Sequence, residues 1–162
     1  VLATARFWRE VVEEVGRDYP DVEYVSVLVD NAAYQLVVDP TRFNGVVLLE
    51  NMQGDILTDQ AGGIIGSLGL MPSACVGPGK VYVEAAHGSA PDIAGQNIAN
   101  PIGTVWAAAM MMQHLGCNAM HDTIMTAIET VIRDQTALTR DMGGNASTQE
   151  LGQAIVNAIQ VS

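Results

Sequence analysis

The feature that most constrains the fold is an alternation of β-forming runs and helical repeats in the first 65 residues. The run Val-Ser-Val-Leu-Val at residues 25–29 predicts a strand, followed by a helix over residues 32–37 with Asn31 as its N-cap. A second run, Val-Val-Leu-Leu at residues 46–49, predicts another strand. Apolar residues at helical spacing then predict a helix that begins at Asp55 and ends near residue 65. This order of elements is typical of an α/β protein.

Two acidic residues stand at the predicted start of that second helix. Gly54 allows a sharp turn after the strand, and Asp55 and Asp59 lie one helical turn apart, so both carboxylates point the same way. A divalent cation between them would offset their repulsion, because hard cations take carboxylate oxygens. The pair also suits an ordinary solvated helix start, where acidic side chains interact favourably with the helix dipole. Spacing alone leaves both interpretations open.

The rest of the chain predicts mostly helices around one long loop. The helices are expected over residues 2–17, from Asn100-Pro101 to about residue 115, over about 119–135, and after a capping box of Ser147 and Glu150. One short strand is expected at residues 81–83. The Gly- and Ala-rich loop at residues 87–95 has no pattern of its own, and such a loop in a compact protein is usually functional. A domain or hinge boundary is expected at residues 66–73.

Composition narrows the classes of partner. The chain has 18 acidic and 7 basic residues and a net charge of −11, which makes nucleic acid and anionic membranes poor partners. The hydrophobic fraction of 49% indicates a large core, a buried partner surface or both. Cys75 and Cys117 are widely spaced and indicate neither a zinc site nor a disulfide framework, so reduced thiols in the cytoplasm are expected. The longest apolar run, residues 105–112, is too short to span a bilayer.

Three stretches together carry a resemblance to a known family. They are residues 51–59 (Asn-Met-Gln-Gly-Asp-Ile-Leu-Thr-Asp), 66–74 (Gly-Ser-Leu-Gly-Leu-Met-Pro-Ser-Ala) and 87–101 (His-Gly-Ser-Ala-Pro-Asp-Ile-Ala-Gly-Gln-Asn-Ile-Ala-Asn-Pro). The first resembles the acidic metal motif of the β-decarboxylating dehydrogenases, the family of isocitrate and 3-isopropylmalate dehydrogenases. The second is most similar to the isopropylmalate branch, and the third resembles the family's nicotinamide-cofactor loop. Residues 29–33 and 141–144 agree as well, and the resemblance covers residues 1 to about 159.

The resemblance implies a three-layer α/β fold of the isopropylmalate dehydrogenase type, of which this chain would be the C-terminal half. Residues 1–65 would complete the second domain, which carries the dimer interface and metal ligands, and residues 66–162 the first, cofactor-binding domain. The other half would carry the substrate-binding arginines, a catalytic tyrosine and a catalytic lysine. The chain opens with Val1 rather than Met, so we expect sequence upstream. A homodimer or a complementing N-terminal half is expected, because half-domains leave sheet edges and apolar helix faces uncovered.

The resemblance also implies a reaction. The family oxidises a 2-hydroxy acid by hydride transfer to NAD or NADP and then decarboxylates the product, while Mg²⁺ or Mn²⁺ chelates the substrate. Asp55 and Asp59 match the metal ligands of one subunit, and Asp30 matches the ligand supplied by the neighbouring subunit. Asp30 and Asp55 are the predicted catalytic residues. Without the family, Asp30 would be interpreted as an ordinary cap or turn residue.

Residues of the long loop match the positions that hold the cofactor in the family. Gly88 allows the backbone to approach the dinucleotide closely, and the Asn100 side chain is expected to be free to meet the adenine edge. A carboxylate at Asp92 would accept hydrogen bonds from the ribose 2′-OH and repel a 2′-phosphate, which indicates NAD rather than NADP. The full set of predicted cofactor-binding residues is His87, Gly88, Ser89, Ala90, Asp92, Ile93 and Asn100.

Departures from the family pattern concern the substrate more than the reaction. Gln53 stands where Phe or Tyr is usual, Ala85-Ala86 replaces Pro-Val, and Asn44 replaces a common Asp. 3-Isopropylmalate, and hence leucine biosynthesis, is the first candidate, while isocitrate, homoisocitrate, tartrate and D-malate remain open.

A function of another class also remains open. The helices predicted after Asn31 and from Asp55 match those of the family's subunit interface, so a half-length chain could serve as a non-catalytic dimerisation or regulatory subunit. Retention of all three Asp ligands and of the complete cofactor loop favours the enzyme, because a structural subunit has no physical need for them.

Overall fold

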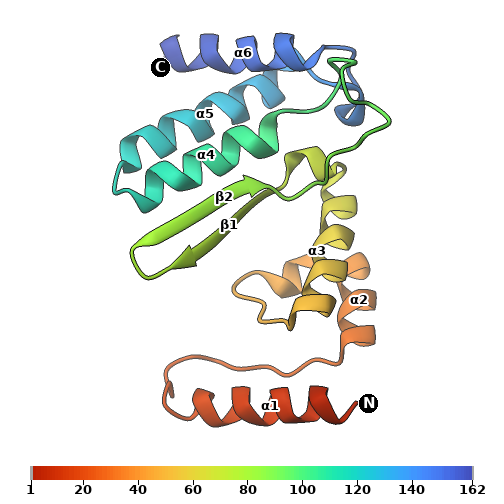
Figure 1. Ribbon diagram of the computed structural model, residues 1–162, viewed down its shortest axis with the longest axis vertical. Coiled ribbons are helices and arrows are strands. Elements are labelled where there is room, and N and C mark those ends of the chain that lie inside the picture. The colour runs from red at the N-terminus through yellow and green to blue at the C-terminus, as the bar shows by residue number, and fades with distance from the viewer. Residues whose placement is uncertain (1, 162) are drawn as a thin grey trace. The chain divides into compact units, whose positions relative to one another are not determined.

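The computed structural model describes residues 2–161 (Figure 1). The chain divides into two compact units, Val1–Val46 and Val47–Ser162, and each is described by itself. The boundary predicted between residues 65 and 66 concerns the domains of a longer protein and stays a prediction.

The first unit consists of two α-helices, a connecting extended segment and one 3₁₀ turn. Helix α1 (Ala3–Gly16) is confirmed where the apolar spacing predicts it, although it buries none of its residues. Helix α2 (Val29–Val38) buries only Ala32 and ends before the turn η1 (Pro40–Phe43). The unit therefore has almost no core of its own.

The prediction of strands at residues 25–29 and 46–49 is wrong for the described chain. Residues 23–28 and 46–50 have no regular secondary structure, and α2 already begins at Val29. Asn31 consequently lies inside the helix rather than at its cap, and its side-chain oxygen accepts a hydrogen bond from Gln35 Nε2 at 3.0 Å. β-forming residues make a strand only where a neighbouring strand takes up their backbone hydrogen bonds. Among the described residues, the only sheet is the hairpin of the second unit.

The second unit is built on an antiparallel hairpin covered by helices. Its elements are α3 (Asn51–Ile65), η2 (Leu68–Leu70), β1 (Pro72–Gly77), β2 (Lys80–Ala85), α4 (Ile102–His114), α5 (Asn118–Asp134), η3 (Arg140–Met142) and α6 (Thr148–Val161). Pro72 pairs with Ala85 and Gly77 with Lys80, so the turn holds only two residues. Helix α4 packs between the hairpin and α5, and α6 packs on α5 (Figure 1). The strand expected at residues 81–83 is confirmed within β2, whereas β1 lies where no strand was expected.

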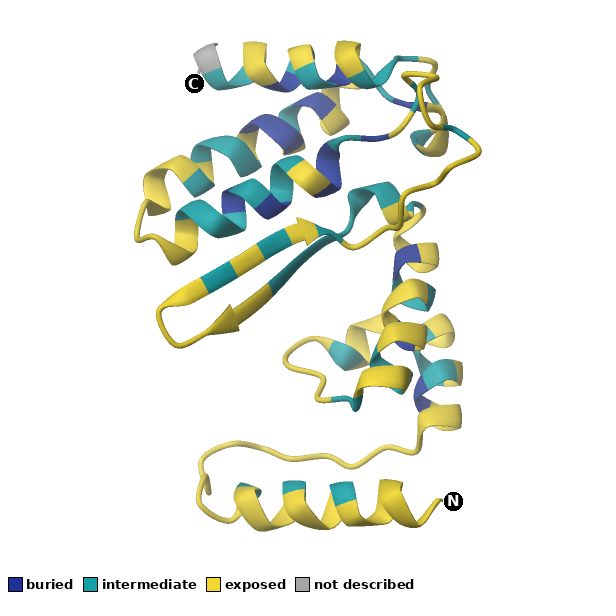
Figure 2. Ribbon diagram, in the orientation of Figure 1, coloured by how far each residue is buried: buried dark blue, intermediate teal, exposed yellow. Residues whose placement is uncertain are grey.

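The core lies among the last three helices. Most of the buried residues lie on α4, α5 and α6, and Figure 2 shows them there in dark blue. The apolar positions of α5 and α6 recur at helical spacing, which turns one face of each helix inward. The buried cluster comprises Ile102, Ala127, Ile128, Val131, Leu151 and Ile155.

Helix ends follow the capping chemistry of the sequence. The Glu50 carboxylate accepts hydrogen bonds from the amides of Met52 and Gln53, at 3.1 and 2.7 Å, so α3 begins four residues earlier than predicted. Gly54 lies inside this helix instead of forming a turn. The capping box of α6 is confirmed, because the Ser147 amide donates to Glu150 and the Glu150 amide donates to Ser147 Oγ. None of the described helices combines the length and apolar character that a membrane span requires.

Candidate cofactor and metal site

The acidic pair of α3 has the geometry expected of two ligands on one helix face. Asp55 and Asp59 lie on successive turns, and both are exposed. No ion pair or side-chain hydrogen bond within the described chain involves either carboxylate. Residues 43–79 contain no Lys, Arg or His that could neutralise them. The donor set, two unpaired carboxylates one turn apart, fits a hard divalent cation.

Asp30, the predicted third ligand, belongs to the other compact unit. It lies in the first turn of α2 and is exposed, and its Oδ1 accepts a hydrogen bond from the Asn31 amide at 2.9 Å. Within residues 2–161, no three His, Cys, Asp or Glu side chains come together as metal ligands. The assignment of the three aspartates to one metal therefore stays a prediction.

The predicted cofactor loop folds around a small cavity. The segment between β2 and α4 contains no helix or strand, and its turns are closed by local hydrogen bonds such as Ile93 N to Ala90 O at 3.1 Å. Ala90 has a φ of +42°, a value that non-glycine residues rarely adopt and that occurs often at binding sites. The cavity measures about 260 Å³, and five of the predicted residues line it: His87, Gly88, Ser89, Ala90 and Ile93. The remaining lining residues are Ala94, Gly95, Asn97, Ile98, Ala99 and Thr148.

The start of α6 is hydrogen-bonded to the C-terminal end of this loop. The sequence did not indicate this contact. The Thr148 amide donates to Asn97 O at 2.9 Å, and Thr148 Oγ1 donates to Ala99 O at 2.5 Å. The Gln149 amide donates to Asn97 Oδ1 at 3.2 Å. Asn97 itself has a φ of +57°. The capping box placed Thr148 at a helix start, but nothing in the sequence shows that this helix start returns to the loop.

The two other predicted cofactor residues lie outside the cavity lining. Asp92 is exposed, and its backbone carbonyl accepts from Gln96 Nε2 at 2.7 Å. Asn100 is only 7% exposed, and both ends of its amide are engaged. Its Nδ2 donates to Asp141 Oδ2 at 2.8 Å and its Oδ1 accepts from the Ile102 amide at 2.9 Å. The expectation of a free Asn100 side chain is therefore wrong, because the side chain accepts from the amide of Ile102, the first residue of α4, and donates to Asp141.

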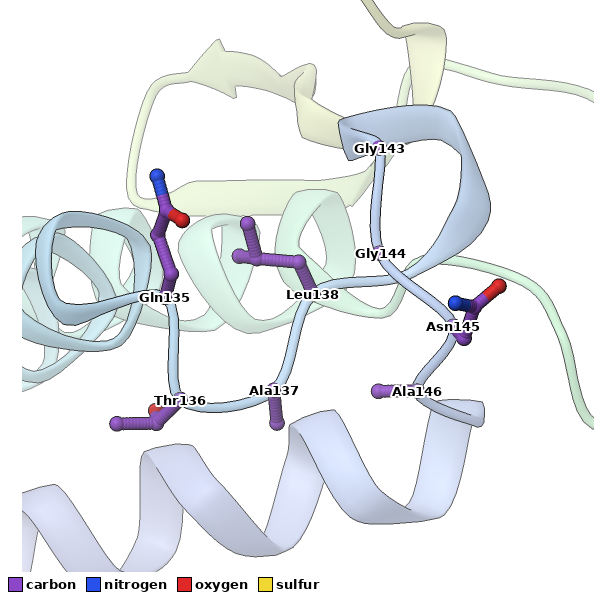
Figure 3. A pocket seen from close by; sticks show the side chains of 8 residues that line it. All are labelled: Gln135, Thr136, Ala137, Leu138, Gly143, Gly144, Asn145 and Ala146. Atoms are coloured by element: carbon purple, nitrogen blue, oxygen red, sulfur yellow. The ribbon is translucent and has the colours of Figure 1, made fainter.

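A second hollow lies beside the loop that carries Asp141 (Figure 3). It measures about 250 Å³ and is lined by residues 135–138 and 143–146. Gln135 and Gly143 have φ values of +53° and +83°, which bend the chain around it. None of the predicted site residues lines this hollow.

Comparison with known proteins agrees with the resemblance. The sequence profile of the isocitrate/isopropylmalate dehydrogenase family matches residues 1–155. An isopropyl malate dehydrogenase of Aspergillus rugulosus is 46% identical over 172 aligned residues, covering 99% of this chain and 46% of that protein. A 3-isopropylmalate dehydrogenase of Bordetella parapertussis is 44% identical, covering 98% of this chain and 46% of that protein. The chain thus spans about half the length of the curated relatives it matches.

Solved structures agree with the fold. An isocitrate dehydrogenase of Methylococcus capsulatus superposes with a TM-score of 0.93 at 38% identity, over 98% of this chain and 47% of that one. A β-decarboxylating dehydrogenase of Thermococcus kodakarensis superposes with a TM-score of 0.84 at 39% identity, over 99% of this chain and 47% of that one. The fold is accordingly part of the α/β fold of these enzymes. The chain belongs to the isocitrate/isopropylmalate dehydrogenase family.

Proposed function

We propose that the protein, as part of a longer or complemented enzyme, catalyses the NAD- and divalent-metal-dependent oxidative decarboxylation of a 2-hydroxy acid. The observation that carries the proposal is the loop at residues 87–99, which lines an open cavity of about 260 Å³. 3-Isopropylmalate is the first candidate substrate, because relatives near 45% identity carry the name 3-isopropylmalate dehydrogenase. Isocitrate, homoisocitrate, tartrate and D-malate are the alternatives.

The cofactor would lie against the loop through main-chain groups. Gly88, Ser89 and Ala90 are small, so the backbone can come close to a dinucleotide. The exposed Asp92 carboxylate has no hydrogen-bond partner among the described residues and is available to a ribose 2′-OH. Residues 81–132 contain no Lys or Arg that could bind a 2′-phosphate, which supports NAD over NADP. NAD held by this loop would supply the hydride acceptor for the substrate.

Asp55 and Asp59 would hold Mg²⁺ or Mn²⁺ together with Asp30 of a second copy of this chain. Their lack of internal partners supports this role, because a carboxylate already bonded within the protein is a weaker ligand. A cation held there supplies Lewis acidity to the substrate's oxygens. The proposal thus includes a homodimer, or a chain complemented by the missing half, working in the cytoplasm.

The function is tested on the full-length enzyme with a panel of the five acids named above. NADH formation is followed by absorbance, with Mg²⁺ or Mn²⁺ and again after chelation. We expect turnover with one acid, a preference for NAD, and loss of activity on chelation that returns with the metal. Failure to reduce NAD or NADP with any acid of the panel would contradict the proposal.

A non-catalytic dimerisation or regulatory subunit is the second candidate. The observation behind it is the exposed apolar surface of α2, where Tyr34, Val37 and Val38 are 67, 62 and 63% exposed. The native mass and an NAD titration separate the two candidates. A 17.1 kDa species that binds no NAD supports the subunit, whereas a longer chain or a companion polypeptide supports the enzyme.

A further inference from the structure

The Asp141 carboxylate joins three segments that are far apart in the sequence. Its Oδ2 accepts hydrogen bonds from Ser67 Oγ at 2.5 Å and from Asn100 Nδ2 at 2.8 Å. Its Oδ1 accepts from Thr139 Oγ1 at 2.5 Å. Ser67 precedes η2, Asn100 ends the cofactor loop, and Thr139 precedes η3. We call Asp141 and these three donors the Asp141 clasp.

Each donor in the clasp is itself held in place. Ser67 Oγ accepts from the Gly69 amide at 3.0 Å, and Asn100 Oδ1 accepts from the Ile102 amide at 2.9 Å. Thr139 is fully buried. The two hydrogen bonds and the burial of Thr139 restrict the rotamers of the three donor side chains. The Asp141 carboxylate therefore accepts from donors that other contacts already orient.

Glycines allow the three segments to come this close. A Cβ at position 69 would lie 2.7 Å from Asn100 Cβ. A Cβ at position 103 would lie 2.8 Å from Met71 O, and one at position 144 would overlap Leu138 O. Side chains at positions 69 and 103 would push the first two segments apart, and one at position 144 would distort the loop that carries Asp141, so the clasp depends on their absence.

The clasp is connected to the cofactor cavity by the loop segment that precedes Asn100. Ile98 and Ala99, which line the cavity, directly precede it. Between residues 87 and 96 the hydrogen bonds of the described chain are local, whereas the Ala86 amide donates to Met71 O at 2.9 Å and the Thr148 amide donates to Asn97 O at 2.9 Å. The loop is thus tied at both ends and depends on those ends for its position.

We propose that Asp141 is a positioning residue for the dinucleotide: by fixing Asn100, it holds the cavity wall at Ile98 and Ala99 in its binding conformation. The carboxylate does not touch the cofactor in this proposal, which rests on the NAD-binding function proposed above. A wall that is already ordered removes part of the entropic cost of binding. Loss of the clasp therefore weakens NAD binding more than it slows the bound enzyme.

A purely structural role makes a different prediction. If the clasp only stabilises the fold, its loss lowers the fraction of active enzyme, and hence kcat, while the KM for NAD stays the same. If it positions the cavity wall, the KM for NAD rises while kcat and the KM for the hydroxy acid change little. The separation of KM and kcat therefore distinguishes the two roles.

The experiment uses the full-length enzyme with Asp141→Asn, which keeps the shape of the side chain but removes its charge. We expect the KM for NAD to rise about tenfold, as when a hydrogen bond to a charged group is lost, with kcat within about twofold of the parent. Ser67→Ala removes one donor and should raise the KM for NAD less. It serves as the second variant if Asp141→Asn does not fold. Asp21→Asn, the same change at an exposed acid of the other unit, should leave both constants unchanged.

Hydrogen exchange makes the clasp visible without NAD. The amides of Gly69 and Ile102, which bond Ser67 and Asn100, should exchange faster in Asp141→Asn than in the parent. Faster exchange with an unchanged KM for NAD in both clasp variants overturns the positioning role and leaves the proposed function intact. A parent enzyme that neither binds nor reduces NAD instead overturns the proposed function, and the positioning role with it.

Discussion

The aspartates of this chain differ in how many side-chain hydrogen bonds their carboxylates accept. Asp141 accepts three side-chain hydrogen bonds, which makes it part of the framework. The carboxylates of Asp55 and Asp92 have no such partner among the described residues. Carboxylates without internal partners remain available to a cation or a ribose, whereas a bonded one would first have to break its contacts. Hydrogen bonding thus separates Asp55 and Asp92 from the framework acid Asp141.

The substitution Asp55→Asn in the full-length enzyme tests the metal site. An amide keeps the size of the side chain but lacks the negative charge that a divalent cation requires, so kcat should fall by at least about 100-fold. The Kd for NAD should remain nearly unchanged, because the predicted cofactor residues lie in another segment. Equal loss of turnover and of NAD affinity, measured by titration, would contradict the metal assignment.

The substitution Asp92→Lys tests the selectivity for NAD. A lysine removes the acceptor for the 2′-OH and supplies a cation for a 2′-phosphate, so the ratio of kcat/KM for NADP to that for NAD should rise at least tenfold, about the value of one charged hydrogen bond. Asp92→Asn, which removes the repulsion without adding charge, is the matched control and should give an intermediate ratio. An unchanged ratio in both variants would count against a role for Asp92.

The Asp141 clasp predicts a pH dependence of stability. Partial burial alone would raise the pKa of Asp141, but the hydrogen bonds from Ser67, Thr139 and Asn100 outweigh it, and the pKa lies below its ordinary value of 3.8. Because the folded pKa is the lower one, the carboxylate stabilises the fold above pH 3.8 and loses this effect as the pH falls through the folded pKa. Urea unfolding should show parent and Asp141→Asn differing at neutral pH and converging in acid. A constant difference down to the acid limit would contradict the clasp.

At the scale of elements, the sequence predicts what each segment forms by itself and misses what depends on a distant partner. The spacing of apolar residues located α1, α4, α5 and α6. It failed for residues 25–29 and 46–49, where strand-forming residues find no neighbouring strand. It also missed β1, which has Val76 as its one β-branched residue and becomes a strand through its pairing with β2.

In the candidate site, too, the sequence predicted the local part and missed the contacts with distant residues. The predicted cavity-lining residues all lie in one short stretch of sequence, from His87 to Ile93, so a motif was enough to find them. The bonds that hold them, Thr148 to Ala99 and Asp141 to Ser67, join residues 49 and 74 positions apart. No local pattern encodes such contacts, which explains why the sequence led us to expect a free Asn100 side chain.

Glycines of two helices give a prediction at this scale. Gly103 in α4 lies against the backbone of residues 69 and 71, whereas Gly152 in α6 has open space where a Cβ would lie. Gly103→Ala should lower the free energy of unfolding by about 1–3 kcal/mol, because backbone carbonyls cannot move aside. Gly152→Ala should be neutral or raise it by up to about 1 kcal/mol through helix propensity. Urea titration measures both, and similar effects of the two substitutions would show that the close approach at Gly103 is not real.

At the scale of the whole chain, much apolar surface remains uncovered. The extended segments contribute strongly, since Val25, Leu28, Val46 and Leu48 are 69, 61, 99 and 61% exposed. Segments of strand-forming residues with unpaired backbone groups can add to the edge of a sheet. A chain that covers about half of its relatives is expected to bury these segments against the remainder of the enzyme or a second copy.

The substitution Val46→Lys tests whether this surface is covered in the working enzyme. Val46 is 99% exposed in this chain, so the exchange should leave the melting temperature of the 162-residue chain unchanged. In the full-length enzyme the same exchange should lower the free energy of unfolding by at least about 1.5–3 kcal/mol, which is the value of burying a valine side chain. The loss should not be smaller than this, because the exchange would also bury an ammonium group. Asn44→Lys, a lysine two residues away at an exposed polar position, should be tolerated in both. If Val46→Lys is as harmless in the full-length enzyme as in the shorter chain, residues 46–49 face solvent in the working protein and are no part of a completed sheet.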